Sequence, residues 1–600
     1  MEKILPGVYK LTLGTPERVT PCAYQEYPPL PVGADTELPF AESDVTFEVT
    51  KRGCLVSLPL RVKNAEGVTS LGEVYGLGLQ LKQFRLTGKK VTVRPNADPT
   101  GPNGDSHAPV PFCVTTGGIG YYIDTARHAA FYCGRSAKLG EGPKTSRYDS
   151  GAELLPADSP EALYQQRAGK RLYVDIPTAQ GVDIYIICGQ SMLEAVQKYN
   201  MFSGGGCLPP EWGLGVWYRS HTHFGPSDWV ELAERIRKQE MPISVFGLEP
   251  GWQTRAYPCS YVHKFGQASL DAIAHIKSLG YRVNAWEHCF THPESPIYEE
   301  MRPYYGDYEG MEGAVPDFTI RECRDIFVRL NRTLGFDGFK LDECDGSDNT
   351  GGWSFPDFAQ FPGGADGEQM HALFGWLYAQ VMNEACPGSY HSVRNMYALA
   401  APYPFVLYSD LYAHSDFIRG VCSASFCGLL WTPEVRDASS VKDLIRRMQS
   451  VVFSPQALIN AWYIKNPPWE QINSSLNNEN IPMEEAEDAA RICRALFQTR
   501  EQLIPYLTEA FAKYKADGTP PFRALVLDFP DDAECYNNDT EWLIGGKYLF
   551  APLTAAADTR EVYLPALPDG AVWARDGKAY PGGKAYEFTC TLEEYLLFAR

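Results

Sequence analysis

The first third of the chain shows short runs in which hydrophobic and polar positions alternate. Val45 to Val49 and Leu55 to Val62 are two such runs, and clusters of Gly, Pro and Asn separate them from their neighbours. Alternation with a period of two is typical of half-buried β-strands. Gly118 to Phe131 predicts a hairpin with a packing role. We therefore expect residues 1–205 to form an N-terminal β-sandwich.

The pattern changes after Ser203 to Gly213, a segment rich in glycine and proline. Beyond it, short apolar runs alternate with amphipathic segments such as Trp229 to Gln239, Leu270 to Leu279 and Met370 to Glu384. This alternation predicts a (β/α)8 TIM barrel over residues 206–520, of the α/β class. The strands are predicted at Gly213–Tyr218, Ile243–Glu249, Val283–Glu287, Phe339–Asp342, Tyr390–Arg394, Phe405–Asp410, Gly428–Thr432 and Leu458–Trp462.

Short alternating runs return at the end of the chain. A helical stretch from about Glu484 to Lys515 comes first, and the Asp-Gly pairs at 569–570 and 576–577 then signal turns. We expect residues 521–600 to form a smaller C-terminal β-sandwich.

Length and composition describe a large folded protein. The chain of 600 residues exceeds the size at which one hydrophobic core stops growing, and 44% hydrophobic with 21% charged residues is ordinary for globular domains. The formal net charge of -20, without Lys and Arg clusters, argues against a nucleic-acid partner. An uncharged ligand such as a sugar fits this charge better.

The location of the protein is predicted from what the sequence lacks. Its start has no apolar core of a signal peptide, and no run of about 18 apolar residues follows. The sixteen cysteines are scattered singly without CxxC pairs. We expect a cytoplasmic protein with reduced thiols and no membrane partner.

Two carboxylates stand at the ends of predicted strands. Asp342, followed by Glu343 and Asp345, ends one strand, and Asp410 ends another. An isolated acidic pair is more often a helix cap or a solvated loop, but the C-terminal ends of barrel strands meet at one rim. Two acids there could cleave a glycosidic bond, one attacking the anomeric carbon and the other protonating the leaving oxygen.

The surroundings of the two carboxylates should differ. A nucleophile stays ionised beside cations, whereas a general acid needs a pKa raised by apolar surroundings or by the other carboxylate. Lys340, two residues before Asp342 and so on the same side of the strand, could supply the cation. Two carboxylates can carry the reaction without a cofactor or metal.

Aromatic residues gather near the predicted strand ends. A single tryptophan is more often a core residue, but sugars present apolar C–H faces that stack on aromatic rings, so the cluster favours a sugar site. The candidates for sugar contacts are Trp252, Trp286, Trp431 and Trp462.

At these residues the chain resembles glycoside hydrolase family 31, a group of mostly exo-acting retaining α-glycosidases. Phe339 to Asp342 (FKLD) resembles the family's nucleophile strand, and Tyr403 to Asp410 (YPFVLYSD) resembles its acid/base segment. Arg394 in SVRN is similar to an arginine that the family uses against the sugar. The resemblance covers nearly the whole chain and implies Asp342 as nucleophile and Asp410 as general acid/base.

Some positions depart from the family pattern. Glu249 stands where the family usually has an Asp before Trp252, and Asn460 and Trp462 stand where it tends to have an Arg and a His. Pro433 and Glu434 likewise replace an Asp followed by Ile and glycines. The resemblance implies hydrolysis of a non-reducing-end α-linked hexose, with glucose as the default. The departures favour an α-galactosidase or α-N-acetylgalactosaminidase as the alternative.

Other classes of protein stay open. The HxH pair at His221 and His223, with His288 and His292 further on, would suit a metal-dependent hydrolase, but no other ligands are spaced to complete a site. A sugar-binding protein without catalysis is a second alternative, and transglycosylation is a third. The expected partner is a small neutral oligosaccharide or α-glycoside, whereas the oligomeric state is left open.

Overall fold

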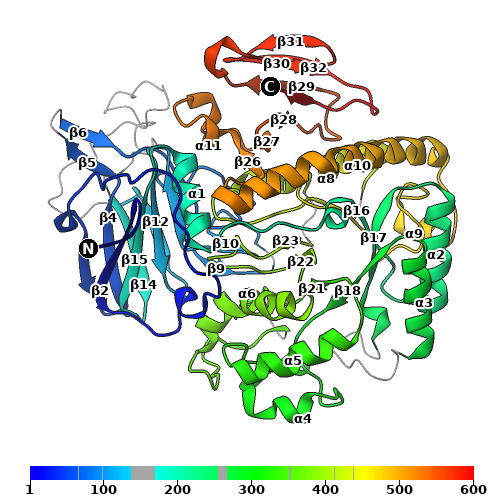
Figure 1. The fold of residues 1–600 in the computed structure, drawn as a ribbon, viewed down its shortest axis with the longest axis horizontal. Helices are drawn as coiled ribbons and strands as arrows, with labels where there is room; N and C mark the ends of the chain where they lie inside the picture. Colours follow the sequence, from blue (N-terminus) through cyan, green and yellow to red (C-terminus); the bar gives the residue numbers. More distant parts are fainter. Residues whose placement is uncertain are drawn as a thin grey trace, which may run out of the picture.

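The computed structural model describes residues 1–64, 67–97, 99–136, 169, 171–253, 266–350, 353–410, 413–436 and 438–600. A β-sandwich, a central barrel and a smaller C-terminal β-domain follow one another along the chain (Figure 1). The fold class predicted from the sequence is thereby confirmed.

Two antiparallel sheets form the sandwich. The first has the order β1 (Glu2–Leu5), β2 (Val8–Thr15), β15 (Gln180–Cys188), β12 (Ile119–Asp124), β11 (Phe112–Thr115) and β7 (Val74–Gly76). The second has the order β3 (Thr46–Val49), β4 (Gly53–Pro59), β14 (Arg171–Pro177), β13 (Ala130–Cys133) and β8 (Lys90–Thr92). Two short pairs are β5 (Arg61–Asn64) with β6 (Gly67–Ser70) and β9 (Arg94–Pro95) with β10 (Asp105–Ser106).

The hairpin predicted at Gly118 to Phe131 is wrong. β12 pairs with β11 and β15, whereas β13 pairs with β14 and β8 in the opposite sheet. Both faces of β12 are buried, because Tyr121 packs between the two sheets and Tyr122 packs in a core shared with the barrel. A strand buried on both faces lacks the alternation that would show which face meets the core. The crossing between sheets therefore left no pattern in the sequence.

Eight parallel strands form the central sheet, and each lies at or next to a predicted run. Their order is β23 (Phe405–Leu407), β22 (His391–Val393), β21 (Gly338–Leu341), β18 (Arg282–Glu287), β17 (Ile243–Leu248), β16 (Val216–Arg219), β25 (Ala457–Asn460) and β24 (Glu434–Val435). A parallel bridge between Leu407 and Trp431 joins the two ends of this order. The sheet therefore closes into a barrel.

The strand predicted at Gly428 to Thr432 begins later than expected. The N–H of Thr432 donates to the carbonyl of Leu407 over 3.1 Å, but β24 itself starts at Glu434 and pairs with β25. Pro433 lies between these two contacts and has no N–H to donate. The proline therefore interrupts the ladder and moves the strand along the chain.

The predicted helices overlap α2 (Pro226–Lys238), α3 (Gln267–Ser278) and α6 (Gly367–Ala385). The barrel region also contains α4 (Tyr298–Met301), α5 (Arg321–Thr333), α7 (His414–Ala424), α8 (Val441–Val452), α9 (Ser474–Asn478) and the hairpin of β19 (Tyr305–Gly310) and β20 (Gly313–Pro316). Asp366 caps α6 by accepting from the N–H of Gln369, and Arg127 of the sandwich contacts Asp366 over 2.6 Å. The sandwich is thus anchored to a barrel helix.

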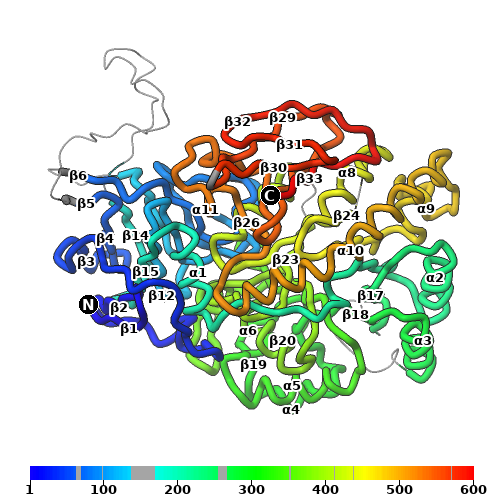
Figure 2. Tube along the Cα trace, turned by 45° about the horizontal axis from the view of Figure 1, so that its top comes forward, coloured from blue at the N-terminus to red at the C-terminus, as the bar shows by residue number. Residues whose placement is uncertain are grey.

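The long helix α10 (Ala486–Asp517) precedes the C-terminal domain and runs between the barrel and the red C-terminal strands (Figures 1 and 2). The remaining elements are α1 (Met192–Phe202), α11 (Leu525–Asp528), β26 (Phe522–Ala524), β27 (Trp542–Ile544), β28 (Tyr548–Phe550), β29 (Thr559–Leu564), β30 (Val572–Arg575), β31 (Lys578–Pro581), β32 (Lys584–Thr589) and β33 (Leu597–Ala599). One apolar core contains Tyr122, Trp376 and Phe598 and so joins all three regions.

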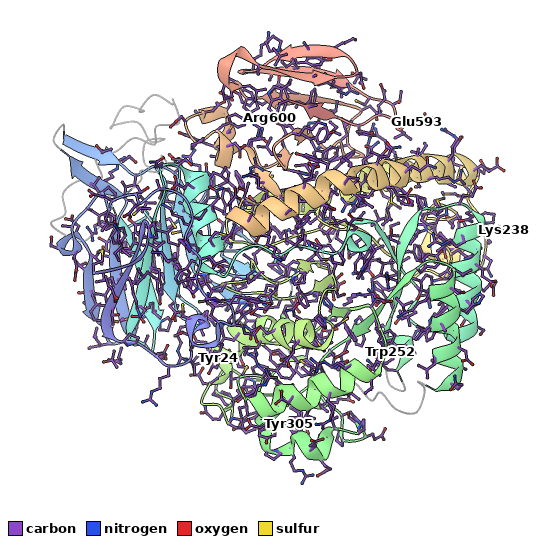
Figure 3. All side chains as sticks on the ribbon, viewed as in Figure 1. Tyr24, Lys238, Trp252, Tyr305, Glu593 and Arg600 are labelled. Atoms are coloured by element: carbon purple, nitrogen blue, oxygen red, sulfur yellow. The ribbon has the colours of Figure 1, made fainter. Side chains whose placement is uncertain are left out.

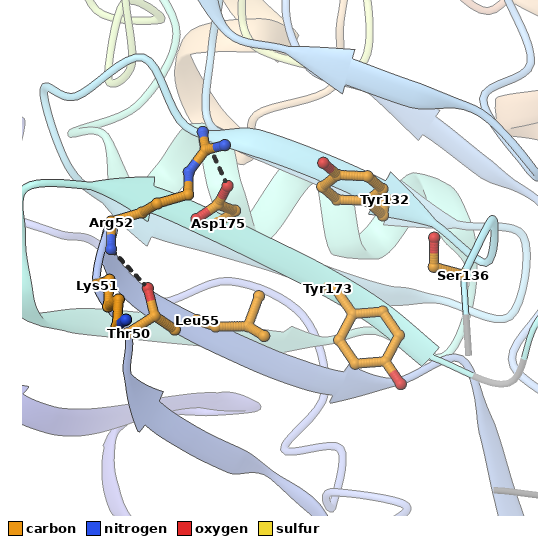
Figure 4. A pocket seen from close by; sticks show the side chains of 8 residues that line it. All are labelled: Thr50, Lys51, Arg52, Leu55, Tyr132, Ser136, Tyr173 and Asp175. Atoms are coloured by element: carbon orange, nitrogen blue, oxygen red, sulfur yellow. Dashed lines mark hydrogen bonds and ion pairs between the residues drawn. The ribbon is translucent and has the colours of Figure 1, made fainter. Parts of the chain in front are cut away.

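A hollow of about 490 Å³ lies on the sandwich, lined by side chains that include Tyr132, Tyr173 and Asp175 (Figure 4). It contains none of the predicted site residues, and Figure 3 shows Trp252 on the barrel side of the molecule. Within the described ranges, no helix has the length and apolar character needed to span a membrane. The cysteines of these ranges are free thiols, and most are buried.

Candidate active site

Four of the predicted site residues come directly after barrel strands. Glu249 follows β17, Asp342 follows β21 and Arg394 follows β22, while Asp410 lies three residues beyond β23. The C-terminal ends of parallel barrel strands open at the same rim. These side chains therefore converge although they are far apart in the sequence.

Asp342 is held by two donors at the end of β21. The indole Nε1 of Trp286 donates to Oδ2 over 2.7 Å, and the backbone N–H of Glu343 donates to Oδ1 over 3.0 Å. Glu343 has a φ of 56°, which is rare for a residue with a long side chain. Strained backbone of this kind clusters at functional sites. The fold thus orients Asp342 by two hydrogen bonds to its oxygens.

Asp410 contacts two arginines. Nη1 of Arg394 donates to Oδ2, and Nη1 of Arg436 donates to Oδ1 over 2.6 Å. Although 43% of its side-chain surface is exposed, partial burial raises the pKa of Asp410; Arg394, Arg436 and Lys340 outweigh this and hold that pKa well below its ordinary value. The raised pKa expected of a general acid is therefore not found at this carboxyl group.

One nitrogen atom bridges the two carboxylates. Nη1 of Arg394, which donates to Asp410, also lies 3.6 Å from Oδ1 of Asp342. Nε of the same arginine donates to Asp345 over 3.0 Å, which fixes the guanidinium plane. Two carboxylate oxygens that contact one nitrogen lie near each other. This arrangement suits the closer pair of carboxylates in retaining glycosidases better than the wider gap of inverting ones.

Lys340, predicted as the cation beside Asp342, and Glu249, which departs from the family pattern, bind each other inside the barrel. Nζ of Lys340 lies 3.2 Å from Oε2 of Glu249, and Arg219 bonds Oε1 of the same carboxylate. The ammonium group of Lys340 also lies 4.9 Å from the centre of the Tyr408 ring. The structure therefore places these two residues in a buried ionic network next to the carboxylates.

Asn460 and Glu434 form a second polar pair on the neighbouring strands β25 and β24. Nδ2 of Asn460 donates to Oε2 of Glu434 over 3.0 Å, and both residues are buried. Burial, together with the charge of Asp410, raises the pKa of Glu434 to about 8. Burial and the charge of Asp342 raise the pKa of Glu343 to about 8 as well. Two carboxyl groups of the site thus hold a proton to higher pH than a free glutamate does.

Two successive hydrogen bonds, from Trp252 to Trp286 and from Trp286 to Asp342, support the Asp342 carboxylate. The indole of Trp252 donates to the backbone carbonyl of Trp286 over 2.7 Å and has no exposed surface. Trp286 in turn donates to Asp342. Trp286 therefore contacts the carboxylate directly, and Trp252 contacts it through Trp286.

The two remaining predicted tryptophans lie in different surroundings. Trp431 is buried and donates to the backbone carbonyl of Phe417 in α7 over 3.0 Å. Trp462 is partly exposed, and the guanidinium carbon of Arg436 lies 4.7 Å from its ring centre. Trp462 therefore reaches the carboxylates through Arg436, whereas Trp431 packs against a helix.

Sequence reasoning did not select His107 or Arg436. His107 bonds Asp345 over 2.7 Å across 238 residues of sequence, and no motif marks it. Arg436 could have been noted as a cation two residues after Glu434, in a segment that departs from the family pattern. The four histidines weighed as metal ligands are not a cluster: among the described residues, no three His, Cys, Asp or Glu side chains are grouped to hold a metal ion.

A closed parallel barrel with two carboxylates at its rim has the groups that cleavage of a glycosidic bond requires. The model described as "Glycosyl hydrolases family 31 TIM-barrel domain" matches residues 206–510, and the "Glycosyl hydrolase family 31 C-terminal domain" matches residues 518–600. The chain therefore belongs to glycosyl hydrolase family 31, which confirms the resemblance seen in the sequence.

Known relatives are distant in sequence. An α-xylosidase of Emericella nidulans is 22% identical over 88% of this chain and 66% of its own length. "Alpha-glucosidase 2" of Bacillus thermoamyloliquefaciens is 21% identical over 70% of this chain and 56% of its own length. A Flavobacterium johnsoniae GH31 dextranase complexed with glucose superposes with a TM-score of 0.74 at 17% identity, covering 94% of this chain and 68% of that one. The chain spans roughly half to two thirds of these proteins.

Proposed function

We propose that this protein is an exo-acting retaining α-glycosidase that removes a non-reducing-end α-linked hexose. Asp342 acts as nucleophile and Asp410 as general acid/base. The observation that carries this proposal is Arg394, because its Nη1 contacts both carboxylates and so brings them to the short spacing of a double displacement.

The reaction follows from the two positions. The Asp342 carboxylate attacks the anomeric carbon while the glycosidic C–O bond breaks, and the departing oxygen takes the proton of Asp410. Asp410 then accepts a proton from water, whose oxygen attacks the same carbon and releases Asp342. Trp286 keeps a lone pair of Asp342 fixed throughout by its 2.7 Å hydrogen bond.

The arginine contacts of Asp410 favour its ionised form, which is the form that acts as the base of the second step. The same charges lower the affinity of the carboxylate for a proton in both steps. In the first step the glycosidic oxygen needs a protonated Asp410, so at least one arginine contact has to weaken as the substrate enters.

The sugar is proposed from the residues around the carboxylates. Glucose is the default because α-glucosidase and dextranase activities occur among the named relatives. The alternative is α-galactosidase or α-N-acetylgalactosaminidase activity, which is supported by the pairing of Asn460 with a protonated Glu434 at positions that depart from the family pattern. Such a neutral pair can both donate to and accept from sugar hydroxyls.

A panel of aryl glycosides tests this function. The α- and β-linked p-nitrophenyl glucoside, galactoside, xyloside and N-acetylgalactosaminide are incubated with the wild type, Asp342→Ala, Asp410→Ala and the exposed control Asp325→Ala. We expect turnover of an α-anomer that falls by about 10³-fold or more in Asp342→Ala and stays unchanged in Asp325→Ala. Asp410→Ala should lose less activity on a dinitrophenyl glycoside than on the p-nitrophenyl glycosides, because the dinitrophenolate leaves without being protonated. Sugar binding without turnover by the wild type would instead identify a binding protein.

A further inference from the structure

His107 belongs to the N-terminal sandwich but lies at the barrel rim. It follows β10, its side chain has no exposed surface, and both ring nitrogens have partners. Nδ1 lies 2.7 Å from Oδ2 of Asp345, and Nε2 lies 2.6 Å from Oγ of Ser409. Its backbone carbonyl accepts from Nδ2 of Asn395 over 2.5 Å.

These three partners lie on three different barrel loops. Asp345 follows β21, Asn395 follows β22 and Ser409 follows β23. Each is next to the candidate machinery: Asp345 accepts from Nε of Arg394 over 3.0 Å, Asn395 is the residue after Arg394, and Ser409 is the residue before Asp410. His107 thus connects the loops that carry both carboxylates through its ring, and the loop of their shared arginine through its backbone carbonyl.

The hydrogen bonds define which ring nitrogen carries a proton. Burial raises the pKa of Asp345, but the charge of Arg394 and the hydrogen bonds from His107 and Arg394 outweigh this and leave that pKa below its ordinary value, so Asp345 is ionised. An ionised carboxylate can only accept, so Nδ1 of His107 is the donor. In the neutral imidazole Nε2 then accepts from the hydroxyl of Ser409. Asp345 therefore receives two donors, His107 and Arg394, which together fix its plane.

We propose that His107 is a positioning residue for the glycosidase reaction: it orients Arg394 through Asp345 and Asp410 through Ser409, so that the N-terminal sandwich is part of the active site. This inference rests on the proposed function. Displacing a reacting group by about 1 Å can cost about 100-fold in rate. The effect is expected in kcat, because the buried ring of His107 bonds Asp345 and Ser409, which hold the reacting groups.

The test uses three substitutions of the same side chain. His107→Ala removes both ring contacts, His107→Asn leaves an amide where Nδ1 was, and His107→Gln leaves one near Nε2. The bond from Asn395 goes to the backbone and survives in all three. His371→Asn is the matched control, because His371 is also buried and bonds the backbone carbonyl of Phe355, between β21 and α6, but neither Asp345 nor Ser409.

We expect His107→Ala to lower kcat by about 100-fold while KM changes by no more than a few fold. His107→Asn should recover at least about tenfold of that loss, since it can still donate to Asp345, and His371→Asn should keep wild-type kcat. Thermal unfolding of each variant checks that the fold is retained. A folded His107→Ala with wild-type kcat, or equal losses in the His107 and His371 variants, would overturn the inference. Absence of turnover by the wild type would count against the proposed function instead, so the two failures are distinguishable.

Discussion

Arg436 is one of the two arginines whose charge opposes acid catalysis by Asp410. It binds Oδ1 of Asp410 over 2.6 Å, and its own side chain is 16% exposed on the face of Trp462. The general acid has to be protonated, so the basic limb of the kcat/KM profile reports the pKa of Asp410. The cations beside Asp410 lower that pKa and therefore move the limb to lower pH.

Replacing Arg436 by Gln should move this limb to higher pH by roughly one unit, since one adjacent arginine lowers an aspartate pKa by about one to three units. The other charged or titratable groups around Asp410 stay in place, namely Arg394, Lys340, Asp342, Glu343, Glu434 and Tyr408. The measurement is kcat/KM against pH on the best aryl glycoside. Arg447→Gln, which removes an ion pair with Asp443 within α8, is the control. An unmoved basic limb in Arg436→Gln would contradict this role of Arg436.

Glu434 makes stability depend on pH. Folding raises its pKa from about 4.3 in a free chain to about 8, so between these values the native state holds a proton that the unfolded state has lost. The contribution of Glu434 to the free energy of unfolding is therefore fully present below about pH 4.3 and is lost as the pH rises towards 8. Glu434→Gln removes the titration but keeps an oxygen that can accept from Asn460.

The melting temperature of Glu434→Gln relative to the wild type should therefore increase from pH 5 to pH 8. Other raised groups, such as Glu343 and Glu541, are present in both proteins and cancel in the comparison. Differential scanning calorimetry at the two pH values provides the measurement. If the melting temperatures of Glu434→Gln and the wild type differ by the same amount at pH 5 and pH 8, Glu434 is already ionised in the folded protein at both pH values.

The residue scale also shows what the sequence could and could not predict. Asp342 and Asp410 were selected because each ends an apolar run, and the structure places them around one arginine. Trp286 was selected as a sugar platform, yet its indole N–H is committed to Asp342. His107 was missed because its partner Asp345 is 238 residues away, so its role exists only in three dimensions.

At the scale of elements, Gly420 of α7 packs against Trp431, whose bridge to Leu407 closes the barrel. A Cβ added there would collide with Nε1 of Trp431, which sits in the bridge to Leu407. Alanine in a helix is worth about 1 kcal/mol more than glycine, but overpacking a buried contact costs about 1 to 3 kcal/mol. The cost of overpacking is therefore expected to exceed the gain in helix propensity.

Gly420→Ala should therefore lower the melting temperature, despite the better helix propensity of alanine. Gly546→Ala, where an added Cβ has no atom within 4 Å, is the matched control and should change stability by no more than about 0.5 kcal/mol. Scanning calorimetry on both variants decides the matter, and a Gly420→Ala protein as stable as the wild type would mean that Trp431 can move aside.

Hydrophobic periodicity and turn residues predicted most helices and strands, but not which strands pair with each other. The barrel strands were located because buried runs and amphipathic helices alternate, and β24 was misplaced because Pro433 shifts the ladder. The hairpin prediction failed at β12, where both faces are buried and the pattern does not show which sheet the next strand joins. Local patterns therefore gave the order of elements, whereas the contacts between sheets depend on packing.

At the scale of the whole molecule, the sandwich, barrel and C-terminal domain share one apolar core, which contains Tyr122, Trp376 and Phe598. Ion pairs of Arg127 with Asp366 and Glu368 further join the sandwich to α6. The contact of His107 with three barrel loops thus rests on an extensive interface. This interface gives the sandwich a structural reason to be retained with the catalytic barrel.

The anomeric form of the first sugar released tests the proposed double displacement most directly. The protein is added to its best α-aryl glycoside in an NMR tube, and the anomeric proton signals are followed before mutarotation. The short gap bridged by Arg394 predicts double displacement, so the α-anomer should appear first and the β-anomer only later. A β-anomer as first product would mean that a water molecule attacks directly, and it would contradict the role of Asp342 as nucleophile.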